Sequence, residues 1–283
     1  MLIIKKRFEM KTLQQFINES VNDYDDPKKL QIKEWIEENN GERAYFTINK
    51  DYSIFITKFD YKGKGNFPDF IQFDKCKHDF YCDNANMTSL RGCPNYVGGD
   101  FICGGNKLTN LEGGPKVVRR DYRCGDSQLT SLKGGPESVG MEFGCGGNKL
   151  TNLEGCPKEI GYSLYCSYNR LTTLKGCPEH IKWDLLCDYN DLKTLENGPK
   201  RIDRSLHCSY NQLTSLKGCP EIIPDHIICD HNKLRTLKDG PKEAEWISCS
   251  DNPISESEKQ WVEQNIKCEG FFWNEIKHDS VVR

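Results

Sequence analysis

Large apolar residues recur along most of the chain at a fixed distance from a cysteine. Eight cysteines, from Cys82 to Cys229, are evenly spaced, and Cys249 follows at an interval shorter by one. The alternation of a large apolar residue and a cysteine predicts a short strand with one buried face, and a fixed period of about 21 residues is typical of a solenoid. The apolar residues stand two positions before the nine cysteines, at Phe80, Phe101, Tyr122, Phe143, Leu164, Leu185, Leu206, Ile227 and Ile247.

The same polar and apolar positions follow each predicted strand. Asparagine stands three residues after the cysteine in seven units, where its amide can satisfy backbone groups that no strand partner reaches. Two inward leucines follow, and in the first eight units the chain then turns at a proline. Because proline cannot donate a ladder hydrogen bond, we expect this side of the coil to be irregular or extended rather than a sheet.

The unit L-x-C-x-x-N-x-L closely resembles the leucine-rich-repeat pattern, over about two thirds of the chain. The resemblance implies a leucine-rich-repeat solenoid of the α/β class, mostly β, with a parallel concave β-sheet, an irregular convex side and helical caps. A Val or Ile stands six residues before each cysteine from Cys103 to Cys229, one more than in the common form, which predicts a bulge or a looser entry ahead of the strand. Ala244, five before Cys249, has the common spacing.

A second resemblance concerns the origin of the protein. The unit N-x-L-T-x-L-x-G-C-P is similar to the repeats of proteins encoded by tailed bacteriophages, and MKTLQQFINES from Met10 resembles openings common among phage proteins. The resemblance implies expression in an infected bacterium. The repeats are also similar to those of secreted bacterial ubiquitin-ligase effectors, which carry a large catalytic domain after the repeats. Only a short segment, up to Arg283, follows Asn252 here, so we expect no such activity.

The segments outside the repeats are expected to cover the apolar ends of the solenoid. The pattern of residues 1–75 predicts an N-terminal cap with helices in KTLQQFINESV and KKLQIKEWIEENN. It also predicts a strand pair that turns at residues 49–51, and a degenerate repeat with Tyr61 in the cysteine position. Residues 76–252 hold the leucine-rich repeats. Residues 253–283 predict a capping helix that begins after Ser255, and a tail in which Phe271 and Trp273 seal the end. The apolar anchors of the second N-terminal helix are Leu30, Ile32, Trp35 and Ile36.

Composition narrows the functional classes. A net charge of −3 and a pI near 6.1 provide no basic field, so we expect no nucleic-acid partner. No apolar segment has transmembrane length, and the run Leu2–Ile4 is too short for a secretion signal, which predicts a cytoplasmic protein without a membrane partner. The fifteen cysteines contain no C-x-x-C pair, so we expect no zinc. Parallel side-chain directions in the cysteine ladder and a reducing cytosol disfavour bridging, so we expect free thiols. No catalytic triad, phosphate loop or metal motif is present, which predicts no enzyme activity, cofactor or metal.

Three rows of side chains carry the candidate binding chemistry. Positions three before, one before and one after the cysteine face outward on the predicted concave sheet, and the position two after it lies where the chain leaves the sheet. The acidic row contains Asp79, Asp100, Asp121, Glu142 and Asp184. The outward row contains Tyr81, Ile102, Arg123, Tyr165, Leu186, His207 and Ile228. The rim row contains Tyr168, Tyr189, Tyr210 and His231, with glycine in the same position at Gly105 and Gly147.

Each row allows two interpretations. The acidic row either solvates an open sheet and blocks edge association, or forms a track for a basic partner beside the apolar residues of the outward row. The rim row either packs on itself to hold the turn, or offers an aromatic surface to a peptide or ring-bearing ligand. His207, His226 and His231 come from neighbouring units, and either lie near one another by chance or converge on a shared site.

The sequence favours a non-enzymatic protein-binding module that acts through its concave face. From the phage resemblance we expect it to bind and block a bacterial host protein, such as an antiviral defence component, in the cytoplasm of the infected host. The alternatives are a structural or virion-associated scaffold and a small-ligand-binding protein that uses the rim row. The oligomeric state is left open.

Overall fold

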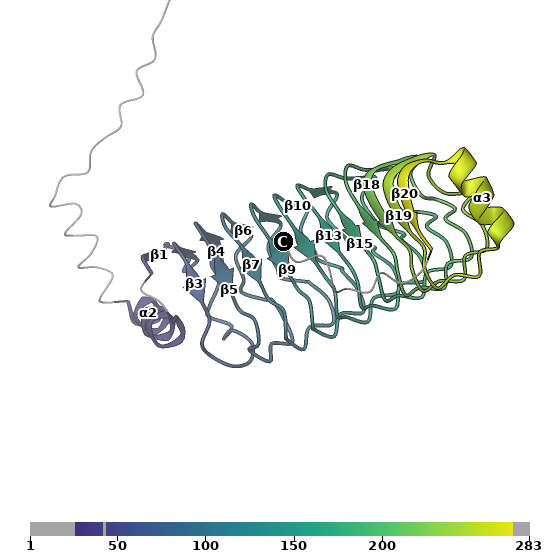
Figure 1. Cartoon of the computed structure of the whole chain (residues 1–283). Helices are drawn as coiled ribbons and strands as arrows, with labels where there is room; N and C mark the ends of the chain where they lie inside the picture. Colours follow the sequence, from purple (N-terminus) through teal and green to yellow (C-terminus); the bar gives the residue numbers. More distant parts are fainter. Residues whose placement is uncertain (1–25, 42–43, 274–283) are drawn as a thin grey trace, which may run out of the picture.

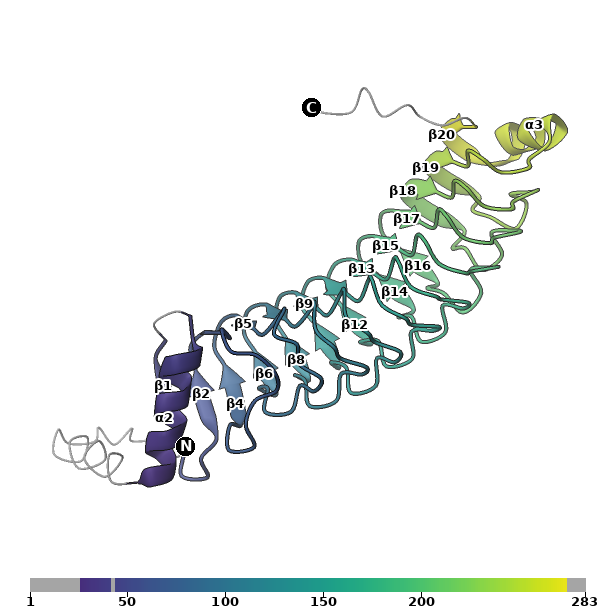
Figure 2. The same ribbon diagram turned by 90° about the horizontal axis from the view of Figure 1, so that it is seen from below.

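The chain forms a curved stack of coils with a helix at each end (Figure 1). The computed structural model describes residues 26–41 and 44–273. Helix α2 (Pro27–Asn39) covers the first coils, and helix α3 (Glu256–Asn265) lies at the opposite end. Figure 2 shows the arc that the stack follows between these two helices.

Eleven short parallel strands, one from each successive coil, form the main sheet. Neighbouring strands pair with an offset of one repeat, as in Phe80 with Phe101 and Phe101 with Tyr122. Identical positions of successive units therefore stack directly on one another, as the period predicts. The strands are β3 (Phe59–Asp60), β5 (Phe80–Tyr81), β7 (Phe101–Ile102), β9 (Tyr122–Arg123), β11 (Phe143–Gly144), β13 (Leu164–Tyr165), β15 (Leu185–Leu186), β17 (Leu206–His207), β18 (Ile222–Ile228), β19 (Glu243–Ser248) and β20 (Lys267–Phe272). This geometry is that of a leucine-rich-repeat solenoid.

A second set of short strands lies on the proline side of the coil. The prolines at which each unit turns lie outside the strands, but the residues two and three after them pair in parallel from coil to coil, so the expectation of no sheet on this side is wrong for these residues. The ladder bonds come from residues that follow the proline and keep their N–H groups. The strands are β4 (Phe73–Cys76), β6 (Tyr96–Val97), β8 (Val117–Val118), β10 (Ser138–Val139), β12 (Glu159–Ile160), β14 (His180–Ile181) and β16 (Arg201–Ile202).

A bulge, one of the two forms of strand entry that the spacing predicts, is present in β18. In β18 both sets merge into one strand, and its register against β19 shifts between Ile223 and His226. Ile223 stands six residues before Cys229, whereas its partner Ala244 stands five before Cys249. The extra residue in β18 is therefore accommodated as a bulge.

The interior of the coil is built from columns of equivalent side chains. The nine repeat cysteines and the apolar residues two before them are at most 2% exposed. All fifteen cysteines are free thiols. Burial raises the pKa of Cys145 to about 12, so this thiol stays protonated at neutral pH. The cysteine column packs as a small apolar ladder, and its burial leaves it without nucleophilic character.

A ladder of buried asparagines holds the turn after six strands of the main sheet, β7, β11, β13, β15, β17 and β18. The Asn190 amide donates to the carbonyl groups of Cys166 and Cys187, and its Oδ1 accepts the Leu171 N–H at 2.9 Å. Asn169 and Asn211 repeat this pattern in the adjacent coils. The amide thus satisfies backbone groups of two coils at once, as the sequence predicts.

The N-terminal end is covered by a helix and a hairpin. Asp26 caps α2, Ile32 and Ile36 are buried, and Trp35 stacks on Phe59 at a centroid distance of 6.1 Å. Leu30 is 40% exposed and does not serve as an anchor. Strands β1 (Phe46–Ile48) and β2 (Ile54–Ile56) form the antiparallel hairpin. The helix predicted over residues 11–21 lies outside the described residues.

The two ends complete the stack with partial coils. Strand β3 places Tyr61 level with Cys82, because Phe59 pairs with Phe80. At the other end Ser255 caps α3, and Val262 and Ile266 are buried. The chain then adds β20, a strand that the sequence pattern did not predict. Neither described helix has the length and apolar character that a membrane crossing requires.

Candidate functional site

A shallow, open groove of about 880 Å³ crosses the main sheet over strands β7 to β15. Glycines such as Gly125, Gly144 and Gly146 form part of its lining, because the early repeats carry no side chain at these outward positions. The groove exists because a flat, bare stretch of sheet adjoins repeats that carry large side chains. We call this surface the sheet groove.

The outward row divides at the boundary of the sheet groove. Ile102, Arg123, Tyr165 and Leu186 line it, whereas Tyr81, His207 and Ile228 lie outside it. The lining therefore combines apolar and aromatic side chains with one guanidinium group. Such a mixture is typical of protein-binding surfaces.

The acidic row has a structural task that neither interpretation of the sequence included. Asp79 Oδ1 accepts the N–H of Asp100 at 3.0 Å, and Asp100 Oδ1 accepts the N–H of Asp121 at 3.2 Å. Asp121 does the same for Glu142, and Asp184 for Ser205. Each of these carboxylates thus satisfies a backbone donor one coil further along. The signal in the sequence was the alternation of Asp with Ser, since both residues can accept this hydrogen bond.

Arginines neutralise much of the remaining charge of the acidic row. Arg120 pairs with Asp100 at 3.3 Å, and Arg123 bridges Asp121 at 2.8 Å and Glu142 at 3.2 Å. The side chains of Asp100 and Asp121 are only 17% and 14% exposed. Repulsion between neighbouring carboxylates is therefore offset within the sheet, and most of this row offers little free charge to a partner.

Most of the free negative charge of the sheet groove comes from residues outside the acidic row, since Glu142, the one member of that row in the lining, is paired with Arg123. Its charged lining residues are the carboxylates Asp83, Asp126, Glu142 and Asp188 and the guanidinium of Arg123, so four negative charges meet one positive charge. Asp83, Asp126 and Asp188 were not among the candidate residues, although the position one after the cysteine, which holds Asp83 and Asp188, is predicted to face outward. Burial raises the pKa of Asp188, against the opposing effect of the Ser209 N–H that its side chain accepts.

The rim row forms a continuous stack of rings, as its spacing predicts. The centroid distances are 4.4 Å from Tyr168 to Tyr189, 4.3 Å from Tyr189 to Tyr210 and 4.2 Å from Tyr210 to His231. His231 also pairs with Asp251 at 3.3 Å. The stack thus continues into an ion pair at its C-terminal end, while Tyr168 borders the sheet groove at its other end.

The rim row lies in a backbone conformation that ordinary residues avoid. The φ angles of Tyr168, Tyr189, Tyr210 and His231 lie between 52° and 57°. This left-handed conformation costs about 1–2 kcal/mol for a residue with a Cβ atom. Gly105 and Gly147 adopt the same conformation without that cost. The tyrosines therefore occupy positions where glycine fits the backbone better, and the stacking contacts offset the difference.

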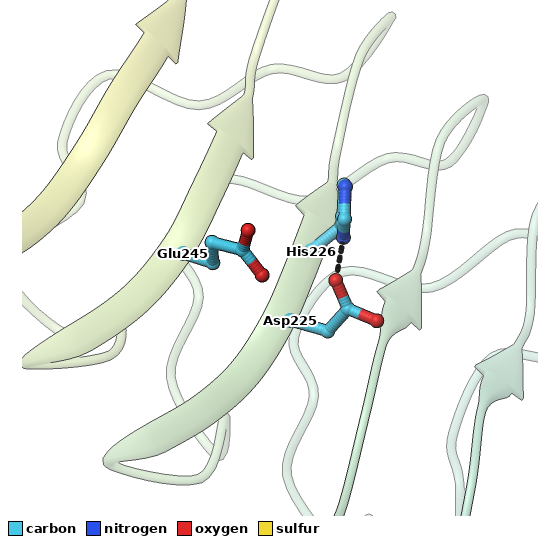
Figure 3. A group of neighbouring side chains, drawn as sticks. All are labelled: Asp225, His226 and Glu245. Carbon is cyan, nitrogen blue, oxygen red and sulfur yellow. Dashed lines mark ion pairs between the residues drawn. The ribbon is translucent and has the colours of Figure 1, made fainter.

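The histidines of neighbouring units do not share one site. Asp225, His226 and Glu245 lie together on adjacent strands and, in the part of the chain that the structure describes, form the one group of three side chains placed closely enough to hold a metal ion (Figure 3). His207 and His231 are not part of this group. Arg204 donates to Asp225 at 2.6 Å, and His226 pairs with the same carboxylate. Burial opposes ionisation of Asp225, yet Arg204 and His226 outweigh it and hold its pKa below the ordinary value. Asp225, Arg204 and His226 form an ion-pair network in this structure.

No family model matches the chain, and no curated protein matches its sequence. Among solved structures, YopM from Yersinia enterocolitica is similar, with 19% identity and a TM-score of 0.49. The match covers 69% of this chain and 50% of YopM, so the matched region spans half of that protein. The repeat register and the stacked parallel strands themselves define the fold class, which is that of a leucine-rich-repeat protein.

Proposed function

We propose that the protein is a non-enzymatic protein-binding module and that the sheet groove is its binding site. The observation that carries the proposal is the composition of the groove, where Ile102, Tyr165 and Leu186 lie beside four carboxylates on a surface that is already formed. Leucine-rich-repeat solenoids are typically interaction scaffolds with extended concave binding surfaces.

The rigidity of the groove supports the proposal. The asparagine ladder and the carboxylate hydrogen bonds fix each coil against the next on both sides of the strand. A partner that binds such a surface orders few side chains and loops, so less binding free energy is lost to ordering. The Arg123 bridge to Asp121 and Glu142 also fixes side chains within the groove.

A capture experiment with matched variants tests the site. The parent protein, Leu186→Lys and Ile222→Lys are immobilised, exposed to bacterial lysate and compared by mass spectrometry. Leu186 lines the groove, whereas Ile222 is a 56% exposed aliphatic residue outside it. A protein captured by the parent and by Ile222→Lys, lost from Leu186→Lys and bound directly after purification supports the proposal. Equal capture by all three proteins places the site elsewhere, and capture of the chain alone favours a structural scaffold.

The resemblance of the repeats to phage proteins supports a narrower proposal about the partner. On that ground we propose that the partner is a bacterial host protein, such as an antiviral defence component, which the module blocks by occupancy in the cytoplasm of an infected bacterium. Expression of the protein in a strain that carries such a defence should restore plaque formation by a sensitive phage. The Leu186→Lys variant should not restore it. Unchanged plaque formation across strains with different defence systems would contradict this role.

A further inference from the structure

The stack of rim-row rings has one open end, and that end lies in the sheet groove. Tyr168 packs on Tyr189 through one face, and no ring of a described residue contacts its other face. Its exposed fraction is 60%, compared with 40% for Tyr189 and 42% for Tyr210, which have a ring on both sides. A planar group of a partner can therefore extend the stack by one layer at Tyr168.

The next layer of the stack is vacant because glycine occupies it. Gly147 stands one repeat before Tyr168 with a φ of 66° and carries no side chain. A Cβ atom at Gly147 would clash with the carboxylate of Asp126, so this carboxylate lies over the vacant layer. Asp126 is exposed and forms no ion pair with any residue between 26 and 273 for which the structure gives a position. The vacant layer is thus bounded by an aromatic face and a carboxylate.

The chemistry of these two boundaries selects the occupant. An aromatic ring in the vacant layer would place its electron-rich face near the carboxylate of Asp126, which is unfavourable. An ammonium group carries the right charge, but it is compact, strongly hydrated and not planar. A guanidinium group is planar, stacks on aromatic faces and binds carboxylates through fixed N–H donors. The four carboxylates and single guanidinium of the groove lining add a field that attracts a cation.

We propose that the sheet groove binds an arginine side chain of its protein partner, with the guanidinium stacked on the open face of Tyr168 and paired with Asp126. The inference rests on the proposed function of the groove as a protein-binding site. It also gives a reason for tyrosine at position 168. The ring is held in a left-handed backbone conformation that glycine adopts freely in the preceding repeats, and it presents a flat face to the groove.

Small probes test the arginine site without any protein partner. Nα-acetyl-arginine amide and Nα-acetyl-citrulline amide are each titrated into the millimolar range, and the tyrosine ring signals are followed by NMR. Citrulline has the shape of arginine but a neutral urea group. The arginine probe should shift the ring signals of Tyr168 with saturation. The citrulline probe should bind at least about 5-fold more weakly, because the cation–π attraction and the ion pair are lost.

Three variants locate the probe. Tyr168→Gly removes the open ring and introduces the residue that Gly105 and Gly147 already show to fit this backbone, so the fold should be kept. Asp126→Asn removes the charge and keeps a residue that tolerates the left-handed conformation. Tyr168→Gly and Asp126→Asn should each weaken binding of the arginine probe by about 3- to 10-fold. Tyr210→Gly interrupts the stack at a distance from the open face and should leave binding unchanged.

Equal binding of the two probes, no saturable binding by the parent, or equal binding by the parent and Tyr168→Gly would overturn the inference. Failure here is distinct from failure of the proposed function. A partner captured by the parent and lost from Leu186→Lys, together with a silent arginine titration, keeps the protein-binding site and removes only the arginine. Saturable, variant-sensitive binding of the arginine probe supports the arginine site independently of any captured protein.

Discussion

Replacing one asparagine of the buried ladder should destabilise the solenoid, and the hydrogen bonds that its side chain makes set the size of the loss. Asn190 is 6% exposed. In Asn190→Ala the Leu171 N–H loses its acceptor and becomes a buried unsatisfied donor, which costs about 1–3 kcal/mol. The Asn190 amide donates to the carbonyl groups of Cys166, Cys187 and Asp188. Each of these carbonyl groups keeps a second donor, which is Asn169, Asn211 and the Tyr168 N–H, respectively. Loss of the hydrogen bonds that the Asn190 amide donates therefore costs less, and we expect Asn190→Ala to lower the free energy of unfolding by about 2–4 kcal/mol in total.

Urea denaturation followed by circular dichroism measures this change. The control is Asn152→Ala, because Asn152 accepts only the Glu154 N–H in a turn at the surface, where water can replace it. The control should lose less than about 1 kcal/mol. Asn190→Asp keeps an acceptor for Leu171 but places a buried charge against carbonyl oxygens, so it should be less stable than Asn190→Ala at neutral pH and recover on acidification. A loss for Asn190→Ala within about 0.5 kcal/mol of the control would refute the reasoning.

Two further substitutions should stabilise the protein. Because burial raises the pKa of Asp188, ionisation of this group costs stability as pH rises through its folded-state pKa. Asp188→Asn should therefore raise the melting temperature at neutral pH. This gain should disappear at a pH below the ordinary carboxyl pKa. Melting curves of the parent and Asp188→Asn at both pH values measure this gain. A gain in melting temperature that is independent of pH would show that it does not come from ionisation of Asp188. The Tyr122 hydroxyl is buried without a hydrogen-bond partner among the described residues, and Phe101 and Phe143 stand in the same column. Tyr122→Phe should therefore raise the free energy of unfolding by about 1 kcal/mol in urea denaturation, whereas a loss of that size would show that the hydroxyl is satisfied.

Much of the fold could be predicted from the sequence because each unit contacts only its neighbours. Phe80 and Phe101 are one repeat apart in the chain and adjacent in the sheet, so the local pattern also states the long-range pairing. The role of Asn190 followed from the same logic, since a polar amide in a buried column must satisfy backbone groups. The stacking of Tyr168 on Tyr189 followed from their equal positions in successive units.

The candidate site was predicted less well, because its chemistry depends on how side chains reach between coils. The acidic row was read as free charge, but Asp100 accepts the Asp121 N–H and pairs with Arg120. Arg120 lies outside the rows that the sequence singled out. Asp188 lines the groove from a position that the repeat predicts to face outward, and Asp126 lines it from the rim position, but neither was among the candidate residues.

The sequence by itself determined the period, the buried columns, the strand register and the ring stack, because these features follow from one repeated unit placed on its own copy. Only the tertiary structure decided the second strand set after the prolines, the strand β20 that completes the last coil, and the sheet groove. The groove arises where glycine repeats give way to tyrosine repeats. Its shape is therefore a difference between neighbouring coils, which becomes a surface only when the coils are stacked in space.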